Sequence, residues 1–393
     1  MRVGVPPIAV HEATRIELRI RPRTGVGCSD SARLTTMTIG KVRPAVLKMA
    51  SYTPGKAAGQ VEAEHGVEDA IKLASNENPW PPVPAVIDAI TNAVAGVNRY
   101  GDNRATDVRG AISDWLGIDE GSITVGCGSS GLLQQLFMVY VDPGDEVVFP
   151  YPSFEVYPIF STQFGATPVT VPLVNFAFDL DAVAAAVTDR TKLVFLATPN
   201  NPTGTSVSVN ELRGFLDAIP NDVIVVIDEA YREFNDPEMG DPASLLSAHP
   251  NVVITRTFSK AFGLAGLRSG YGLCDPAIVT ELDKVRLPFS INNLAQVAVL
   301  AAIEHRAEAM ERVGTLIEER ARCVAALAVE GYEVPAPNGN FIFIPTGEAT
   351  SSIAQRMEKD GVVTRPFPDL GLRISVGMAD ENARWFSSFV KAG

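Results

Sequence analysis

The most constraining feature of the sequence is a regular alternation between residues 121 and 274. Short apolar, β-branched runs are separated by stretches with helical spacing, a rhythm that predicts crossover units and a largely parallel sheet. Several runs, such as 223–227, are apolar throughout, which is typical of strands buried on both faces. The predicted strands are Ile123–Gly126, Glu146–Phe149, Pro168–Val171, Lys192–Ala197, Val223–Ile227, Val252–Arg256 and Ser269–Leu273. We therefore expect an α/β fold with a mostly parallel, seven-stranded sheet flanked by helices.

The rest of the chain predicts a second, smaller α+β domain. A long helical pattern from Leu294 to about Val329 leads out of the sheet region. It is followed by predicted strands at Asn340–Pro345, Val362–Arg365 and Leu372–Val376, with helices at Ser351–Lys359 and Asp380–Lys391. The predicted layout is a disordered tail (1–50), a first segment of the small domain (51–98), the large domain (99–305) and the C-terminal small domain (306–393).

The first 36 or so residues contain six arginines but no apolar segment of the kind that a secretory signal requires. We interpret this stretch as a tail outside the fold. Met37 or Met49 are equally acceptable as the true start, and an organellar transit peptide is the less favoured alternative.

Charge and composition narrow the classes of partner. The chain has 33 basic and 46 acidic residues, a formal net charge of −13, so nucleic acid and anionic membrane are not expected partners. No apolar run approaches the ~18 residues that span a bilayer. Four scattered cysteines predict no disulfide framework and fit the cytoplasm, and four histidines without ligand spacing predict no metal site.

A lysine and an arginine stand in a glycine-rich segment that directly follows a predicted strand. Lys260 comes just after the strand at 252–256, and Arg268 lies eight residues later. Open α/β sheets bind ligands at the carboxyl ends of their strands. A lysine desolvated there loses its proton more readily and can form a Schiff base with an aldehyde. An isolated Ser-Lys pair would more often be an ordinary surface feature, so neighbouring motifs must support this interpretation.

Asp228 ends the apolar run 223–227, and a carboxylate there is costly to bury without a cationic partner. The protonated nitrogen of a ligand's pyridine ring is one such partner. Tyr231 is then placed to hydrogen-bond a phenolic oxygen on the same pyridine ring. The alternative is an Asp that caps the next helix.

Two further turns follow predicted strands. Asn201, preferred over Asn200, lies between two prolines in 197–204 and could donate to an anionic ring oxygen, although a simple Asn-Pro turn is the alternative. Ser129 and Ser130 stand in a glycine-rich turn before a helix, a common arrangement that can cradle phosphate, with Ser259 and Arg268 as complements.

Taken together, the motifs resemble those of fold-type I pyridoxal-phosphate aminotransferases of the histidinol-phosphate and aromatic group. The resemblance covers about residues 72–392. It rests on KLASNENP (72–79), RYGDN (99–103), PYPSFEVY (150–157), ATPNNPTG (197–204), VIDEAYREF (226–234), TFSKAFGLAGLRSGYG (257–272) and GLRISVG (371–377).

The resemblance implies a site for pyridoxal 5'-phosphate and a role for each matching residue. Lys260 would form the Schiff base and shuttle the proton, Asp228 would pair with the ring nitrogen, and Phe154 would stack on the ring. Asn201 and Tyr231 would hold the phenolic oxygen, and Ser129, Ser130, Ser259 and Arg268 the phosphate. Arg373, otherwise interpretable as a surface arginine, would clamp the substrate carboxylate. Asn76 and Arg365 are further substrate-binding candidates, and Tyr100 would reach the cofactor of the second subunit in a homodimer with shared sites.

The function implied is amino transfer between an aromatic amino acid, phenylalanine foremost, and 2-oxoglutarate. Its partners are thus small molecules, an amino acid and a 2-oxo acid. The Arg-Pro-Phe at 365–367 favours the aromatic branch, but Arg365 could equally hold a phosphate, so a histidinol-phosphate aminotransferase is the alternative. A lyase or decarboxylase on the same fold is less favoured. A non-enzymatic scaffold is disfavoured because Lys260, Asp228 and Arg373 are all present.

Overall fold

A computed structural model describes residues 41–47, 49 and 55–392. The chain divides into two units between Val42 and Arg43, and every helix and strand described below belongs to the second unit. The predicted disordered tail, 1–50, falls mostly outside the described residues. Its described part contains the four-residue helix α1 (Pro44–Leu47).

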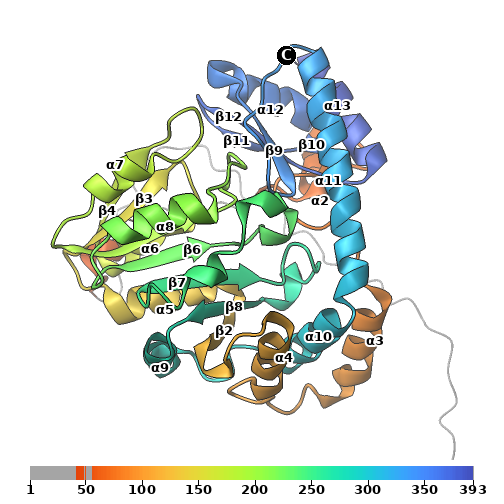
Figure 1. Ribbon diagram of the computed structural model, residues 1–393. Coiled ribbons are helices and arrows are strands. Elements are labelled where there is room, and N and C mark those ends of the chain that lie inside the picture. Colours follow the sequence, from red (N-terminus) through yellow and green to blue (C-terminus); the bar gives the residue numbers. More distant parts are fainter. Residues whose placement is uncertain (1–40, 48, 50–54, 393) are drawn as a thin grey trace, which may run out of the picture. The chain divides into compact units, whose positions relative to one another are not determined.

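A seven-stranded sheet forms the centre of this unit (Figure 1). Its strands are β2 (Ile123–Cys127), β3 (Glu146–Tyr151), β4 (Thr167–Pro172), β5 (Thr191–Ala197), β6 (Ile224–Asp228), β7 (Val252–Thr257) and β8 (Ser269–Cys274). They are ordered β2-β8-β7-β6-β5-β3-β4, and β8 alone in this sheet runs antiparallel to its neighbours. The seven predicted strands and the mostly parallel α/β fold are confirmed, with ends shifted by no more than two residues.

Both faces of the sheet are covered by helices. Along β6, Val225 and Ile227 belong to one apolar core and Ile224 and Val226 to the other, as expected from the alternation of side chains along a strand. Burial of each such side chain stabilises the fold by roughly 1.5–3 kcal/mol. One core contains residues of α5 (Gly128–Tyr140), α6 (Val156–Phe164) and α9 (Pro276–Val285). The other contains residues of α3 (Pro84–Ala93), α4 (Thr106–Leu116), α7 (Leu180–Ala185), α8 (Val209–Ala218) and α10 (Asn293–Glu304).

The C-terminal part forms a small sheet with its own helices, joined to the large sheet by the long helix α11 (Arg306–Val329), which runs along one side in Figure 1. The small sheet has the order β11 (Arg365–Phe367), β12 (Gly371–Ser375), β9 (Phe341–Ile344), all antiparallel. Its helices are α12 (Thr350–Lys359) and α13 (Ala379–Ala392).

An early segment of the chain also joins this part. After α2 (Ala58–His65), strand β1 (Ile71–Lys72) pairs in parallel with β10 (Val362–Val363). The backbone N–H of Ser375 donates to the carbonyl of Leu73 at 2.8 Å, which extends the connection beyond the strand pair. Residues 71–76 are thereby fixed beside the C-terminal strands.

Two predicted elements are divided in the structure. The helix predicted from Leu294 is interrupted at His305 (φ −101°, ψ 26°), which separates α10 from α11, although no glycine or proline marks the break. The predicted strand Val362–Arg365 changes sheet at Thr364, because β10 pairs with β1 whereas β11 pairs with β12. Pro366 lacks a backbone N–H, and its place in the edge strand β11 is the position in a sheet that tolerates this.

The topology brings the carboxyl ends of β2, β3, β5, β6 and β7 to one edge of the large sheet. This is the edge at which a parallel α/β sheet binds its ligand. The predicted boundaries after residues 50, 98 and 305 stay predictions. Among the helices of the described residues, none combines the length and apolar character needed to cross a membrane.

Candidate active site

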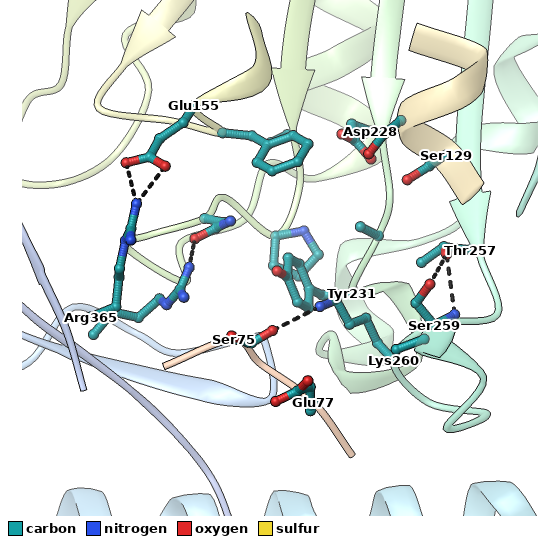
Figure 2. Close-up of a pocket in the computed structure, with 18 of the residues that line it drawn as sticks. Ser75, Glu77, Ser129, Glu155, Asp228, Tyr231, Thr257, Ser259, Lys260 and Arg365 are labelled. Carbon is teal, nitrogen blue, oxygen red and sulfur yellow. Dashed lines mark hydrogen bonds and ion pairs between the residues drawn. The ribbon is translucent and has the colours of Figure 1, made fainter. Parts of the chain in front are cut away.

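A cavity of about 250 Å³ opens at this edge of the large sheet. One wall consists of residues that directly follow β2, β3, β5, β6 and β7, and the opposite wall carries residues of β11 and β12. The segment that contains Ser75 and Glu77 crosses between them, as Figure 2 shows. The cavity is therefore built by segments from both ends of the described chain.

Lys260 follows β7 by three residues and projects into this cavity (Figure 2). Its Nζ donates to the carbonyl of Ser75 at 3.1 Å and lies 5.7 Å from the centre of the Tyr231 ring. Burial lowers the pKa of Lys260 to about 8, with a further lowering from the charge of Arg373. At pH 7 about a tenth of such amines are neutral, against well under a thousandth for an ordinary lysine. Lys260 is thus available as a nucleophile and a base.

Asp228 is the last residue of β6 and is 3% exposed. Its carboxylate accepts hydrogen bonds from the hydroxyl of Tyr157 at 2.9 Å and from that of Thr255 at 3.2 Å. No lysine, arginine or histidine among the described residues forms an ion pair with it. Burial accordingly raises the pKa of Asp228 to about 6. A ligand that brings a protonated nitrogen would relieve this desolvation.

The junction of β2 and α5 brings the first turn of α5 next to Arg268. Gly128 has φ +69°, and a Cβ there would lie 2.6 Å from Nη2 of Arg268. At Gly270, in β8, a Cβ would lie 2.5 Å from the backbone nitrogen of Ser129. Both glycines are thus required for Arg268 and the first turn of α5 to converge. A helix N-terminus beside a guanidinium favours a phosphate or another anion.

Hydroxyl groups complete this side of the cavity. Ser129, Ser130, Thr257 and Ser259 all line it. The hydroxyl of Thr257 donates to that of Ser259 at 2.9 Å, and the backbone N–H of Ser259 donates back to Thr257 Oγ1 at 3.1 Å. These mutual bonds fix the direction of both side chains before a ligand binds.

The opposite wall carries two arginines that are direct cross-strand neighbours, Arg365 in β11 and Arg373 in β12. Arg373 is 7% exposed and donates from Nη1 to the side-chain oxygen of Asn201 and from Nη2 to the carbonyl of Ala74. Arg365 donates from Nη2 to both carboxylate oxygens of Glu155, at 2.8 and 2.6 Å. Arg365 therefore contacts a charged side chain of the opposite wall, whereas these two contacts of Arg373 are to uncharged oxygens.

The structure brings together most of the residues that the sequence singled out. The eleven that line the cavity are Ser129, Ser130, Phe154, Asn201, Asp228, Tyr231, Ser259, Lys260, Arg268, Arg365 and Arg373. Asn76 is 1% exposed and lies behind Tyr231, to whose hydroxyl its amide donates at 3.0 Å. Tyr100 is 82% exposed, stacks on Phe289 and does not line the cavity. The individual roles of all thirteen stay predictions.

Sequence reasoning missed three side chains that contact this set. Tyr157 and Thr255 hold the Asp228 carboxylate, and Glu155 pairs with Arg365. The register of β6 and β7, which places Thr255 opposite Asp228, would have indicated one of them. The other contacts join residues 71 and 210 positions apart, and local patterns carry no signal for them.

Away from the cavity, the structure groups Glu64, His65 and Glu358 closely enough for a metal ion, a set that the sequence did not indicate. The ammonium of Lys56 lies 2.7 Å from both glutamates. A positive charge of the chain itself therefore already balances this cluster.

Comparisons with known proteins identify the class to which this fold and site belong. Residues 68–387 match the family model for class I and II aminotransferases, so the chain belongs to this family and is an aminotransferase. Among its relatives is an aromatic amino acid aminotransferase of Mycobacteroides abscessus, 43% identical over 87% of this chain and 96% of the relative. Another, from Rhodococcus jostii, carries the same name and is 45% identical over 84% and 90%.

Solved structures give the same fold. A histidinol-phosphate aminotransferase from Sinorhizobium meliloti, crystallised with pyridoxal-5'-phosphate, has a TM-score of 0.84 and is 28% identical, covering 91% of this chain and 98% of that one. An aspartate aminotransferase of Thermus thermophilus, 23% identical, has a TM-score of 0.79 with 90% and 100% covered. The fold-type I assignment made from the sequence is confirmed.

Proposed function

We propose that this aminotransferase transfers the amino group of an aromatic amino acid, phenylalanine foremost, to 2-oxoglutarate with pyridoxal 5'-phosphate as its cofactor. The observation that carries the proposal is the cavity in which Lys260, Asp228 and Arg373 converge, in a chain whose relatives at 43–45% identity are named aromatic amino acid aminotransferases.

The chemistry of the donor set fits this cofactor. Asp228 is a buried carboxylate with hydroxyl partners and no ion pair among the described residues, which suits a protonated ring nitrogen. The α5 N-terminus, Arg268 and the neighbouring serines form a cradle for the phosphate, and Lys260 supplies an amine of lowered pKa for the aldehyde. Phe154 offers a flat apolar face to the ring.

Pyridoxal phosphate, when bound, supplies an electron sink that stabilises negative charge at the amino acid's α-carbon. The protein's part is to bind, orient and move a proton. Arg373 would hold the substrate α-carboxylate with its guanidinium, and Lys260 Nζ would carry the proton at the α-carbon. The side-chain oxygen of Asn201 accepts from Arg373, so its amide nitrogen would donate to the phenolic oxygen of the cofactor ring. The hydroxyl of Tyr231 would donate to the same oxygen.

The preference for an aromatic substrate is supported by the wall around Arg365. Phe367, the last residue of β11, lines the cavity and offers apolar surface to the ring of a substrate. The histidinol-phosphate alternative stays the second candidate, because an enzyme of that name from Sinorhizobium meliloti has the same fold and Arg365 could bind a phosphate if Glu155 moved aside.

The substrate proposal is tested by steady-state assays of the purified holoenzyme. With 2-oxoglutarate as acceptor, we expect kcat/KM for phenylalanine to exceed that for histidinol phosphate by at least tenfold. The opposite order would replace the aromatic assignment with the second candidate. Release of carbon dioxide or ammonia without any oxo acid would instead indicate a lyase or decarboxylase.

The cofactor and its anchor can be tested without turnover. Addition of pyridoxal phosphate to the protein, followed by borohydride reduction and peptide mass mapping, should place the pyridoxyl group on the peptide that contains Lys260. Labelling spread over several surface lysines would contradict the assigned site.

We also propose that a second copy of the chain covers the surface around Tyr100. Tyr100 and Leu287 are 82% and 73% exposed, and such large apolar side chains gathered beside Phe289 suit a protein partner. Analytical ultracentrifugation should give a dimer that Tyr100→Ala weakens; a monomer at micromolar concentration would exclude it.

A further inference from the structure

The ion pair between Glu155 and Arg365 lies inside the cavity, between the two sheets. Both carboxylate oxygens accept from one guanidinium nitrogen, and both residues line the cavity (Figure 2). The side chain of Glu155 is 37% exposed and that of Arg365 18%. Glu155 makes no side-chain capping bond to α6, so its carboxylate does not serve the helix that it precedes. Among the described residues, Glu155 forms its ion pair with Arg365.

The two arginines of this wall therefore differ in what they offer a ligand. The Asn201 and Ala74 oxygens that accept from Arg373 are uncharged, whereas Arg365 contacts the carboxylate of Glu155. The charge of Arg365 is already neutralised by Glu155. Since the two strands hold these residues directly opposite each other, Glu155 also reduces the repulsion between two like charges.

This difference matters because the reaction that we propose needs two unlike substrates in one cavity. Resting on that proposed function, we infer that Glu155 determines specificity by competing with the side-chain carboxylate of the dicarboxylic substrate for Arg365. An aromatic substrate leaves the pair intact and packs beside it. Glutamate or 2-oxoglutarate displaces the Glu155 carboxylate, which returns to the solvent that it already partly contacts.

The geometry makes such an exchange feasible. The Glu155 side chain is already 37% exposed, so on release its carboxylate is hydrated more readily than that of a fully buried pair. Glu155 thereby lowers the affinity for the diacid while keeping an uncompensated charge away from an aromatic ring.

The test is Glu155→Gln in the holoenzyme, which keeps the size of the side chain and removes the competing charge. We expect the KM for 2-oxoglutarate to fall roughly three- to tenfold, and the KM for phenylalanine to change by a smaller factor. Calorimetric titration with glutarate and with 3-phenylpropionate, which bind without reacting, should show the same gain for glutarate alone.

The matched control is Glu308→Gln. Glu308 pairs with Arg312 on α11 at 2.7 Å, outside the cavity, and its loss should leave both titrations unchanged. Arg365→Gln combined with Glu155→Gln completes a double-mutant cycle, in which the effect of Glu155→Gln on glutarate should vanish. If Glu155→Gln does not fold, Glu155→Asp, with a shorter reach, should give a smaller gain in the same direction.

Unchanged or weaker glutarate binding in a folded Glu155 variant would overturn the inference, as would an equal gain for 3-phenylpropionate. Failure of the proposed function is distinguishable, because it would show as an unmodified enzyme that transfers no amino group from phenylalanine, while the glutarate titration still reports on Glu155.

Discussion

The two walls of the cavity are held in different ways. On the large sheet, Asp228 and Lys260 stand at the ends of buried strands, and their partners are hydroxyls and a carbonyl within a packed interior. On the small sheet, Arg365 stands in a three-residue edge strand, and its partner Glu155 belongs to the other wall and is partly solvated. The side chains of the large-sheet wall are held by buried contacts. On the small-sheet wall, Arg365 is held by an ion pair that is partly exposed to solvent.

This difference suggests that the residues that perform the reaction and the residues that select the substrate lie on different walls. Groups whose pKa values are shifted by burial lie on the large sheet, where the proposed roles predict that a change removes the reaction for every substrate. On the small sheet, the proposal assigns Arg373 to the α-carboxylate that all substrates share and Arg365 to the second carboxylate of a diacid, so changes at Arg365 should redistribute affinity among substrates. Variants on the two walls should therefore fail differently.

The largest effect is expected for Lys260→Ala. Removing the amine that we propose binds the cofactor aldehyde and carries the proton should lower kcat by roughly 10⁴-fold or more for all substrates alike. Single-turnover assays with phenylalanine and glutamate measure this, with Lys284→Ala, at a 61% exposed lysine, as the control. Loss with one substrate only would break the proposed division between the walls.

Arg373→Gln should come next. Loss of a buried charge that would bind a carboxylate costs about 2–5 kcal/mol, so kcat/KM should fall roughly 30- to 5,000-fold for aromatic and dicarboxylic substrates together. Arg322→Gln removes a guanidinium from a side chain that is 52% exposed and should leave kcat/KM unchanged. A loss for only one class of substrate would mean that Arg373 binds the side chain of the substrate rather than its α-carboxylate.

Arg365→Gln tests the proposed difference between the two arginines of the small sheet. The variant should raise the KM for 2-oxoglutarate roughly 10- to 100-fold, because a charged hydrogen bond is lost, and change that for phenylalanine much less. Steady-state kinetics with each substrate varied in turn provide the measurement. Equal effects on both substrates would assign Arg365 to the scaffold of the wall.

The smallest effect concerns stability. The folded-state pKa of Asp228 is about 6, above the value near 4 of an unfolded chain. The folded protein without cofactor binds this proton more tightly, so the contribution of Asp228 to stability falls as pH rises from about 4 to about 6. Asp228→Asn should therefore be more stable by about 1–3 kcal/mol at pH 7.5 and equal near pH 4. Urea unfolding of both cofactor-free proteins tests this, and a difference independent of pH would contradict it.

The large sheet was predictable because its signals are local. An apolar run such as 224–227 that ends in Asp228 specifies a buried strand, its polarity and its ligand-binding end within a few residues. The division of the long helix at His305 was not predictable, since helix-forming residues continue through it. Tertiary packing outweighs local propensity at such points.

The site follows the same rule. Lys260, Asp228, Asn201 and Arg268 could be assigned to one cavity because each lies close to a strand end. The Glu155–Arg365 pair could not, because it joins residues 210 positions apart whose approach depends on how the small sheet docks. A sequence pattern fixes strand ends, whereas contacts between separately folded segments require the packed structure.

The pairing of β1 with β10 bears on how the protein is made. Ser75 accepts from Lys260, but its segment is fixed by strand partners at 362–363 and by Ser375. During synthesis the large sheet has its last strand once residue 274 has left the ribosome, about 120 residues before the chain ends. The cavity can form only after nearly the whole polypeptide has been synthesised. A nascent or prematurely terminated chain can therefore contain Lys260 without the wall that encloses it.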